Sequence, residues 1–144
     1  MLFRSFDAVR AAMRAATILV HPSAGLGDGL PNVIREAMAL GTPVIASDVA
    51  GIPEALDRGR CGMLVPTKDV YALAAAIETL LGDATLRRSY AERARRRTEE
   101  LFDLWRNGAR LADVLRATTR SAPGREQPAR AKLAELHGEG LTRC

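Results

Sequence analysis

The stretch of this sequence that could do chemistry is a glycine-rich segment followed by an apolar, helix-forming run. Gly25, Gly27 and Gly29 precede Pro31, which stands where the first turn of a helix is expected. The first N–H groups of a helix have no partner within it and lie at the positive end of its dipole, so they attract anions such as a diphosphate. Glycine lets a ligand approach the backbone closely. The segment is therefore predicted to bind an anion.

Two acidic residues flank this predicted anion site. Asp28 stands just before the helix, and Glu36 follows eight residues later, inside it. Carboxylates that face a diphosphate repel it unless they accept hydrogen bonds, and the hydroxyl groups of a sugar and a ribose would supply such bonds. In the alternative interpretation, Asp28 is an acid favoured by the helix dipole and Glu36 is a solvated helix residue.

The elements around the segment predict a parallel sheet. Short apolar runs bounded by turn residues are typical of strands buried on both faces, and they occur at Thr17–His21, Pro43–Ser47 and Gly62–Val65. Helices are expected at Phe6–Ala15 and at Pro31–Leu40, the latter closed by Gly41. Strand, helix and strand in this order form a right-handed βαβ unit, and open sheets of this kind bind ligands at the carboxyl ends of their strands. The predicted fold class is α/β, with a partial Rossmann-like parallel sheet of about three strands flanked by helices.

The second half of the chain is predicted to be helical. Apolar residues recur at helical spacing over residues 69–81, over Ala84–Leu101 with arginines on the opposite face, and from Leu104 to about Thr118. Beyond this point the composition turns to Pro, Gly, Arg, Glu and Gln. We therefore expect one domain over residues 1–118 and a flexible basic tail over residues 119–144.

Composition narrows the class of protein. The 144 residues are 47% hydrophobic and 26% charged, which fits one globular domain, and no apolar run is long enough for a membrane span. Cys61 and Cys144 form neither a disulfide framework nor a metal site, and no signal peptide is evident, so a cytoplasmic protein is expected, with peripheral membrane association left open. The net charge is +4; Lys68 and Lys132 are the two lysines among the 21 basic residues, and the rest are arginines.

One stretch resembles a known family. The run from His21 to Pro66 contains Gly-Leu-Pro-Asn, then Glu-Ala-Met-Ala-Leu-Gly-Thr-Pro-Val-Ile-Ala-Ser-Asp-Val-Ala-Gly-Ile-Pro-Glu, then Arg-Cys-Gly-Met-Leu-Val-Pro. It is similar to the carboxyl-terminal, donor-binding half of a family 4 retaining glycosyltransferase of the GT-B type. The similarity extends more loosely to about residue 118. It implies the carboxyl-terminal lobe of a GT-B fold and a donor substrate that is a nucleotide-diphosphate sugar, with no further cofactor and no metal.

The resemblance also implies roles for individual residues. Asp28 and Glu36 match an acid and a glutamate of the family motif, which usually has glutamate at the first position. By resemblance, Asp28 would hold hydroxyls of the donor sugar and Glu36 the ribose. The N–H groups of Leu30, Asn32 and Val33 would face the diphosphate, with Gly27 and Gly29 beside it. The implied reaction transfers the sugar to a hydroxyl of a glycan, lipid or small-molecule acceptor with retention at the anomeric carbon.

The same sequence features also allow other functions. If Thr17–His21 is the fourth strand of a doubly wound sheet, strands one to three are missing, its edge is unpaired, and a separate amino-terminal lobe would have to complete an active enzyme. The alternative is a non-catalytic module that binds a nucleotide or a partner protein. Arginines between residues 87 and 97 could form a patch for nucleic acid or an acidic membrane. A solvated helix face is favoured because no aromatic face interleaves for base stacking, so no nucleic-acid partner is expected. Glu54 could cap its own helix or reach the nucleotide, and the local role is favoured. His21 could touch substrate or pack at the end of its strand.

Overall fold

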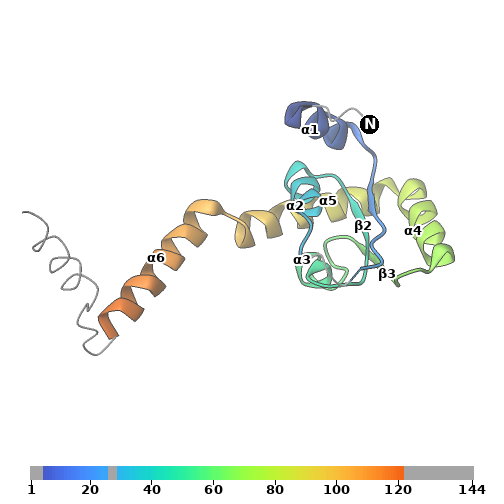
Figure 1. Ribbon diagram of the computed structural model, residues 1–144. Helices are drawn as coiled ribbons and strands as arrows, with labels where there is room; N and C mark the ends of the chain where they lie inside the picture. Colours follow the sequence, from blue (N-terminus) through green and yellow to red (C-terminus); the bar gives the residue numbers. More distant parts are fainter. Residues whose placement is uncertain (1–4, 26–28, 122–144) are drawn as a thin grey trace, which may run out of the picture. The chain divides into compact units, whose positions relative to one another are not determined.

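The computed structural model describes residues 5–25 and 29–121. Helices and strands follow in the order α1 (Phe6–Ala15), β1 (Leu19–His21), α2 (Asn32–Leu40), β2 (Val44–Ser47), α3 (Ile52–Ala55), β3 (Met63–Val65), α4 (Val70–Gly82), α5 (Ala84–Leu101) and α6 (Leu104–Ser121) (Figure 1). The chain divides into two compact units between Leu104 and Trp105, so the sheet and α1 to α5 belong to the first unit.

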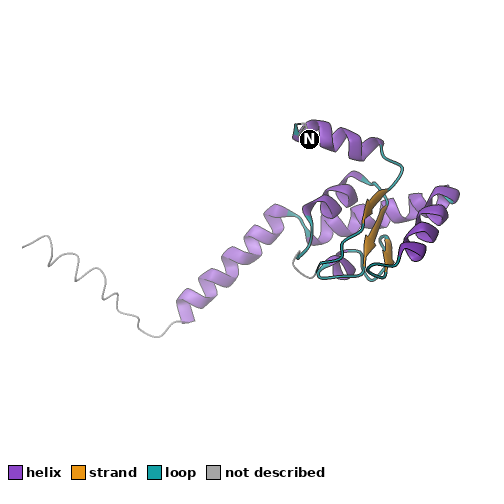
Figure 2. Cartoon of the chain, turned by 45° about the vertical axis from the view of Figure 1, so that its right-hand side comes forward, coloured by secondary structure: helices purple, strands orange, loops and turns teal. Residues whose placement is uncertain are grey.

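The three strands form one parallel sheet in the order β1-β2-β3 (Figure 2). Val20 pairs with Ile45, and Ile45 with Met63, so β2 lies in the middle. All four residues of β2 are buried, as expected of a strand that helices cover on both faces. Within the described part of the chain, no strand pairs with the other edge of β1. The predicted α/β class with a partial Rossmann-like sheet of three strands is confirmed.

Side chains of the sheet alternate between two apolar clusters. Val44 and Ala46 pack with buried residues of α2, α3 and α5, whereas Ile45 packs with Val65 and with Leu80 of α4. This alternation follows from the two-residue period of a strand. Consequently α2, α3 and the part of α5 around Ala94 cover one face of the sheet, whereas α4, together with Leu86 and Tyr90 of α5, packs on the other.

Short polar contacts fix where the helices begin and end. Asp69 and Asp83 cap α4 and α5, each carboxylate accepting a backbone N–H at 2.8 Å. Gly41 ends α2 with φ of 74°, a left-handed conformation that glycine adopts without strain. The buried hydroxyl of Thr42 donates to the carbonyl of Met13 at 2.8 Å and so ties the end of α1 to the turn before β2.

The predicted boundaries need small corrections. The strands begin at Leu19, Val44 and Met63 instead of Thr17, Pro43 and Gly62, because pairing starts only at those residues. α2 begins at Asn32, and Pro31 is its N-cap. The last helix continues to Ser121, beyond Thr118. The domain limit at residue 118 stays a prediction, and most of the expected tail, residues 122–144, lies outside the described residues.

Some arginines of α5 have structural roles that periodicity did not predict. Arg97 donates to the carbonyls of Glu54 at 2.6 Å and Ala55 at 2.9 Å, and so binds α3 to α5. Arg87 donates to the carbonyls of Leu80 and Leu81 at the end of α4. A purely solvated arginine face is therefore wrong for these two residues.

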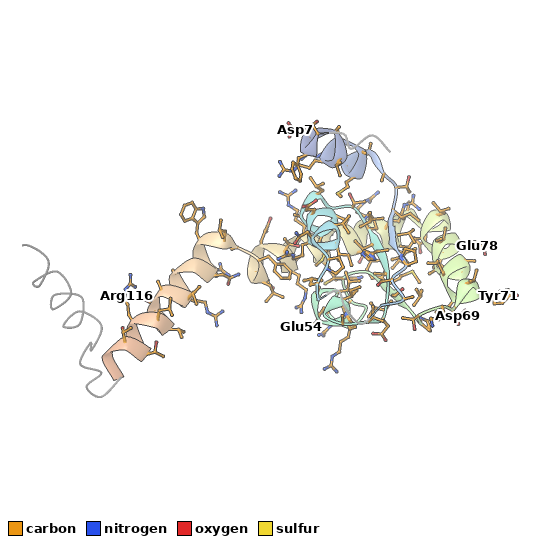
Figure 3. The ribbon with its side chains drawn as sticks, viewed as in Figure 1. Asp7, Glu54, Asp69, Tyr71, Glu78 and Arg116 are labelled. Atoms are coloured by element: carbon orange, nitrogen blue, oxygen red, sulfur yellow. The ribbon has the colours of Figure 1, made fainter. Side chains whose placement is uncertain are left out.

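The helix α6, taken by itself, is amphipathic. Trp105, Leu111, Val114 and Leu115 are exposed apolar residues on it. Arg116, labelled in Figure 3, lies on the same helix and pairs with Asp113 at 2.9 Å. None of the helices in the described part of the chain combines the length and apolar character that a membrane crossing requires.

Candidate functional site

The loops that leave the carboxyl ends of β1 and β2 are joined by a backbone hydrogen bond. The N–H of Gly51 donates to the carbonyl of Gly29 at 3.2 Å. A Cβ atom on Gly51 would lie 3.4 Å from that carbonyl oxygen and 3.5 Å from Cβ of Leu30, so the two loops are in close contact. This contact places the start of α2 at the edge of the sheet where open α/β folds bind ligands.

The start of α2 carries unused backbone donors. Pro31, its N-cap, has no side-chain hydrogen bond to the helix, and the first two helical residues are Asn32 and Val33. The carboxamide oxygen of Asn32 accepts from the guanidinium of Arg35, so the Asn32 side chain is turned along the helix instead of capping it. Within the described residues, the N–H groups of Asn32 and Val33 are left for a ligand or for water.

Glu36 is half-buried and lies about 6 Å along the axis from Asn32, at 1.5 Å per residue. The nearest cation in sequence, Arg35, is engaged with Asn32 and lies over the ring of Phe102 with 5.6 Å to the centroid. No hydrogen bond or ion pair joins the Glu36 carboxylate to any residue that the structure describes. This carboxylate is therefore free to accept hydrogen bonds from a ligand.

Gly29 is exposed, and nothing lies within 4 Å of a Cβ atom built on it. Contacts within the described chain therefore do not require glycine at this position, whereas a ligand that approached the backbone would. Of the other predicted site residues, Leu30 is half-buried beside Gly51. Gly27 and Asp28 lie outside the described residues, so the predicted pairing of Asp28 with Glu36 stays a prediction.

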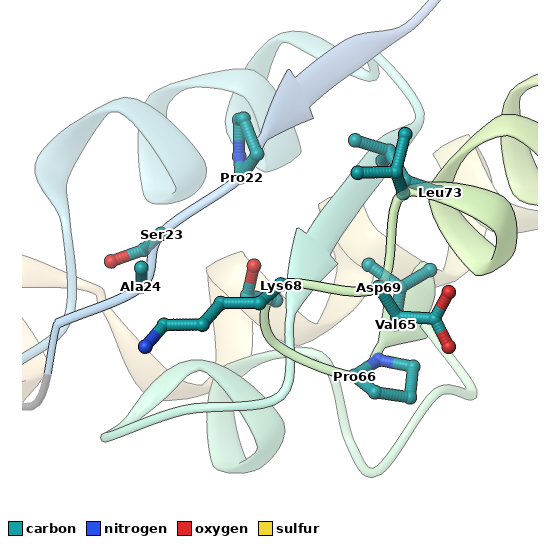
Figure 4. Close-up of a pocket in the computed structure, with 10 residues that line it drawn as sticks. Pro22, Ser23, Ala24, Val65, Pro66, Lys68, Asp69 and Leu73 are labelled. Carbon is teal, nitrogen blue, oxygen red and sulfur yellow. The ribbon is translucent and has the colours of Figure 1, made fainter.

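A cavity of about 160 Å³ opens at the same edge of the sheet (Figure 4). Its lining includes Pro22, Ser23, Ser47, Val65, Lys68 and Leu73, which come from the ends of all three strands and from α4. Ser47 shares the face of β2 with Ile45, so the cavity lies on the α4 side of the sheet. The sequence analysis did not predict this cavity. It could have been predicted from the residues that directly follow each strand, because the carboxyl ends of parallel strands meet at one edge of the sheet.

His21 and Glu54 both lie near the carboxyl edge of the sheet, at the end of β1 and after β2 along the chain. His21 is the last residue of β1, half-buried and paired in register with Ala46. Glu54 projects from α3 and is exposed (Figure 3). Its carboxylate makes no hydrogen bond to another described residue, so the expected local cap is not formed there.

The groups whose pKa departs from its usual value surround the turn before β3, away from the carboxyl ends of the strands. A hydrogen bond from Arg60, together with the charge of Arg97, lowers the pKa of Asp57 although partial desolvation opposes it. Arg60 pairs with the carboxylate of Asp57 at 2.8 Å, and Arg97 pairs with the same carboxylate at 3.7 Å. Burial raises the pKa of the Cys61 thiol. The shift of Asp57 belongs to an ion-pair cluster with Arg60 and Arg97, whereas that of Cys61 follows from its place in the apolar core.

Fold and site together define an α/β sheet unit of the kind found in GT-B glycosyltransferases. The structure matches part of sucrose-phosphate synthase from Thermosynechococcus elongatus with a TM-score of 0.75 and 32% identity, over 85% of this chain and 30% of that one. It also matches Anabaena HepE, solved in complex with UDP-glucose, with a TM-score of 0.72 and 27% identity, over 80% of this chain and 31% of that one.

The particular family follows from the sequence. The glycosyl transferases group 1 family matches residues 2–83, more than half of the chain, and the chain belongs to this family. One relative is the phosphatidyl-myo-inositol mannosyltransferase of Mycobacterium leprae, 45% identical over 80 residues, which are 56% of this chain and 21% of the mannosyltransferase. The chain thus spans less than a third of the length of each of these relatives.

Proposed function

We propose that this chain is the donor-binding half of a retaining glycosyltransferase, which transfers a sugar from a nucleotide-diphosphate sugar to a hydroxyl of an acceptor. The observation that carries the proposal is the entrance of α2. There, an exposed glycine, unused backbone N–H groups and an unpaired carboxylate, Glu36, occur together at the carboxyl edge of the sheet. The HepE structure in complex with UDP-glucose supports a donor of this class.

Each group has a defined part in binding the donor. The N–H groups of Leu30, Asn32 and Val33 face the diphosphate, where the positive end of the helix dipole also acts. Glu36 accepts hydrogen bonds from the ribose, and Asp28 accepts them from the donor sugar. Gly29, with Gly27 before it, leaves room for the ligand beside the backbone.

The chemistry asked of these groups is electrostatic. Negative charge develops on the departing diphosphate while the sugar becomes positively charged at the anomeric carbon. Backbone N–H groups that are already oriented stabilise that charge without reorganising during the reaction. The acceptor is a glycan, a lipid or a small molecule. Residues outside the α2 entrance bind it and complete the active site, for example those of a separate amino-terminal lobe that also covers the free edge of β1.

Calorimetry on the full chain with UDP, GDP and UDP-glucose tests this proposal. A hydrogen bond to a charged group contributes about 1.5–3 kcal/mol, so Glu36→Gln should weaken nucleotide binding by roughly 10-fold or more. Glu78→Gln is the matched control, because Glu78 is exposed on the outer face of α4 (Figure 3). Equal affinity of Glu36→Gln and the parent chain for every nucleotide would refute the assignment.

A second candidate function is a non-catalytic module that binds a nucleotide or a partner protein. The observation that favours it is the edge of β1, which pairs with no other strand in the described part of the chain and offers unpaired backbone groups to another polypeptide. The two candidate functions differ in whether the chain converts a sugar donor to product. Release of UDP from UDP-glucose by the chain, in the presence of an acceptor, favours the enzyme, whereas binding without turnover favours the module.

A further inference from the structure

The cavity on the α4 side of the sheet is separate from the entrance of α2. Its walls include the apolar side chains of Pro22, Val65 and Leu73. Its volume of about 160 Å³ is below the roughly 300–1,000 Å³ of pockets for drug-sized ligands. The cavity therefore suits a compact ligand or one small part of a larger ligand.

Lys68 supplies a cation at the mouth of this cavity. It belongs to the loop after β3, and its ammonium group extends toward Ser23 and Ala24 in the loop after β1 (Figure 4). It is the one lysine among the described residues, and no ion pair or hydrogen bond joins it to any of them. Its φ of 62° lies in the left-handed region, which an L-residue other than glycine rarely adopts. An exposed, unpaired ammonium group is thus held beside an apolar cavity.

Two hydroxyl groups complete the set of donors. Ser47 is only 3% exposed, lines the cavity and makes no side-chain hydrogen bond to another described residue. The oxygen of Ser23 accepts from the N–H of Gly25 at 3.4 Å, which leaves the Ser23 hydroxyl hydrogen free to donate. The one carboxylate in the lining, Asp69, caps α4 and points away from the ammonium group of Lys68 (Figure 4). The polar part of the cavity is therefore arranged to donate hydrogen bonds.

We propose that this cavity is a second ligand site, which binds a phosphate monoester with a small apolar body. The ammonium group of Lys68 and the hydroxyls of Ser23 and Ser47 converge on the phosphate oxygens, and Pro22, Val65 and Leu73 contact the apolar part. A phosphate is favoured over a carboxylate because three donors from different strands match a tetrahedral group better than a planar one. The site is independent of nucleotide binding at α2 and does not rest on the proposed function.

The two lysines of the chain make a direct test possible. Reductive methylation with a carbon-13 label converts Lys68 and Lys132 to dimethyl-lysines that keep their charge, and each gives its own NMR signal. Phenyl phosphate is the probe, with benzoate and sodium chloride at equal ionic strength as comparisons. We expect phenyl phosphate to shift the Lys68 signal saturably and to leave the Lys132 signal in place, and we expect benzoate to bind at least 5-fold more weakly.

Variants of the unmodified chain, studied by calorimetry, complete the test. Lys68→Gln should weaken phenyl phosphate binding about 10-fold, and Ser47→Ala about 3-fold, whereas Lys132→Gln should not change it. Circular dichroism checks that each variant is folded. Equal, unsaturable shifts of both lysines, or unchanged affinity in Lys68→Gln, would overturn the proposal, and equal binding of benzoate would overturn the choice of phosphate. Loss of nucleotide binding in Glu36→Gln leaves these readouts unchanged, so the two proposals can fail separately.

Discussion

Replacing Gly62 by alanine should destabilise the protein through a collision inside the sheet. A Cβ atom at this position would lie 2.8 Å from the carbonyl oxygen of Val44 and 3.1 and 3.3 Å from the two methyl groups of Leu56. Val44 belongs to the central strand, and Leu56 is fully buried, so neither neighbour can move away easily. Such overpacking costs about 1–3 kcal/mol.

The unfolded state partly offsets this cost. Alanine reduces the conformational entropy of the unfolded chain relative to glycine, which favours folding by about 0.4–1 kcal/mol. We therefore expect a net loss of about 1–2 kcal/mol in the free energy of unfolding for Gly62→Ala, or roughly 5–10 °C in melting temperature. Urea unfolding followed by far-UV circular dichroism measures this difference.

Gly29→Ala is the matched control, because no atom lies within 4 Å of its Cβ position. Its free energy of unfolding should stay within about 0.5 kcal/mol of the parent value, as for other open surface positions. Its nucleotide affinity should nevertheless fall if a ligand approaches the backbone there. A Gly62→Ala variant as stable as the parent chain would show that the packing around β3 is looser than these distances imply.

Three other perturbations test the contacts that hold the site in place. Arg97→Ala should lower the free energy of unfolding by about 1–3 kcal/mol in urea titrations, because the carbonyl of Ala55 loses its side-chain donor and that of Glu54 keeps only the N–H of Asp57 at 3.2 Å. Exposed Arg88→Ala should stay within about 0.5 kcal/mol of the parent value. Thr42→Val should lower the free energy of unfolding by about 0.5–1.5 kcal/mol, since the buried carbonyl of Met13 loses the hydroxyl donor and keeps only the N–H of Ala16 at 3.2 Å; no change would show that water replaces the hydroxyl. The lowered pKa of Asp57 stabilises the fold above the unfolded pKa of about 3.9, and this contribution is lost as the pH falls through the folded pKa. The stability difference between the parent chain and Asp57→Asn should therefore shrink on acidification below about pH 4, and a constant difference from pH 7 to pH 3 would contradict the assignment.

Much of the first unit could be predicted because its signals are local. Apolar runs bounded by turns located the three strands, and Gly41 marked the end of α2 at its left-handed φ of 74°. The helix Phe6–Ala15 was predicted with its observed bounds. Strand starts were less accurate, because a strand begins where a partner backbone begins. Thr17 has suitable side-chain chemistry, yet pairing starts at Leu19.

The candidate site was also predicted only where its signals are local. The glycines, Pro31 and Glu36 lie within one short segment, so local spacing was enough to predict an anion-binding helix entrance there. Nothing local indicated that Arg97 binds the end of α3 across 42 and 43 residues of chain, or that Gly51 contacts Gly29. These contacts join segments that are distant in sequence, and periodicity carries no information about them.

The sequence by itself determined the succession of strands and helices along the chain, the helix entrance after the glycines, and the family. Tertiary structure alone decided that Ser23, Ser47 and Lys68, which follow or end three different strands, line one cavity. The physical reason is that parallel strands bring their carboxyl ends to one edge of the sheet only after pairing fixes their order and register.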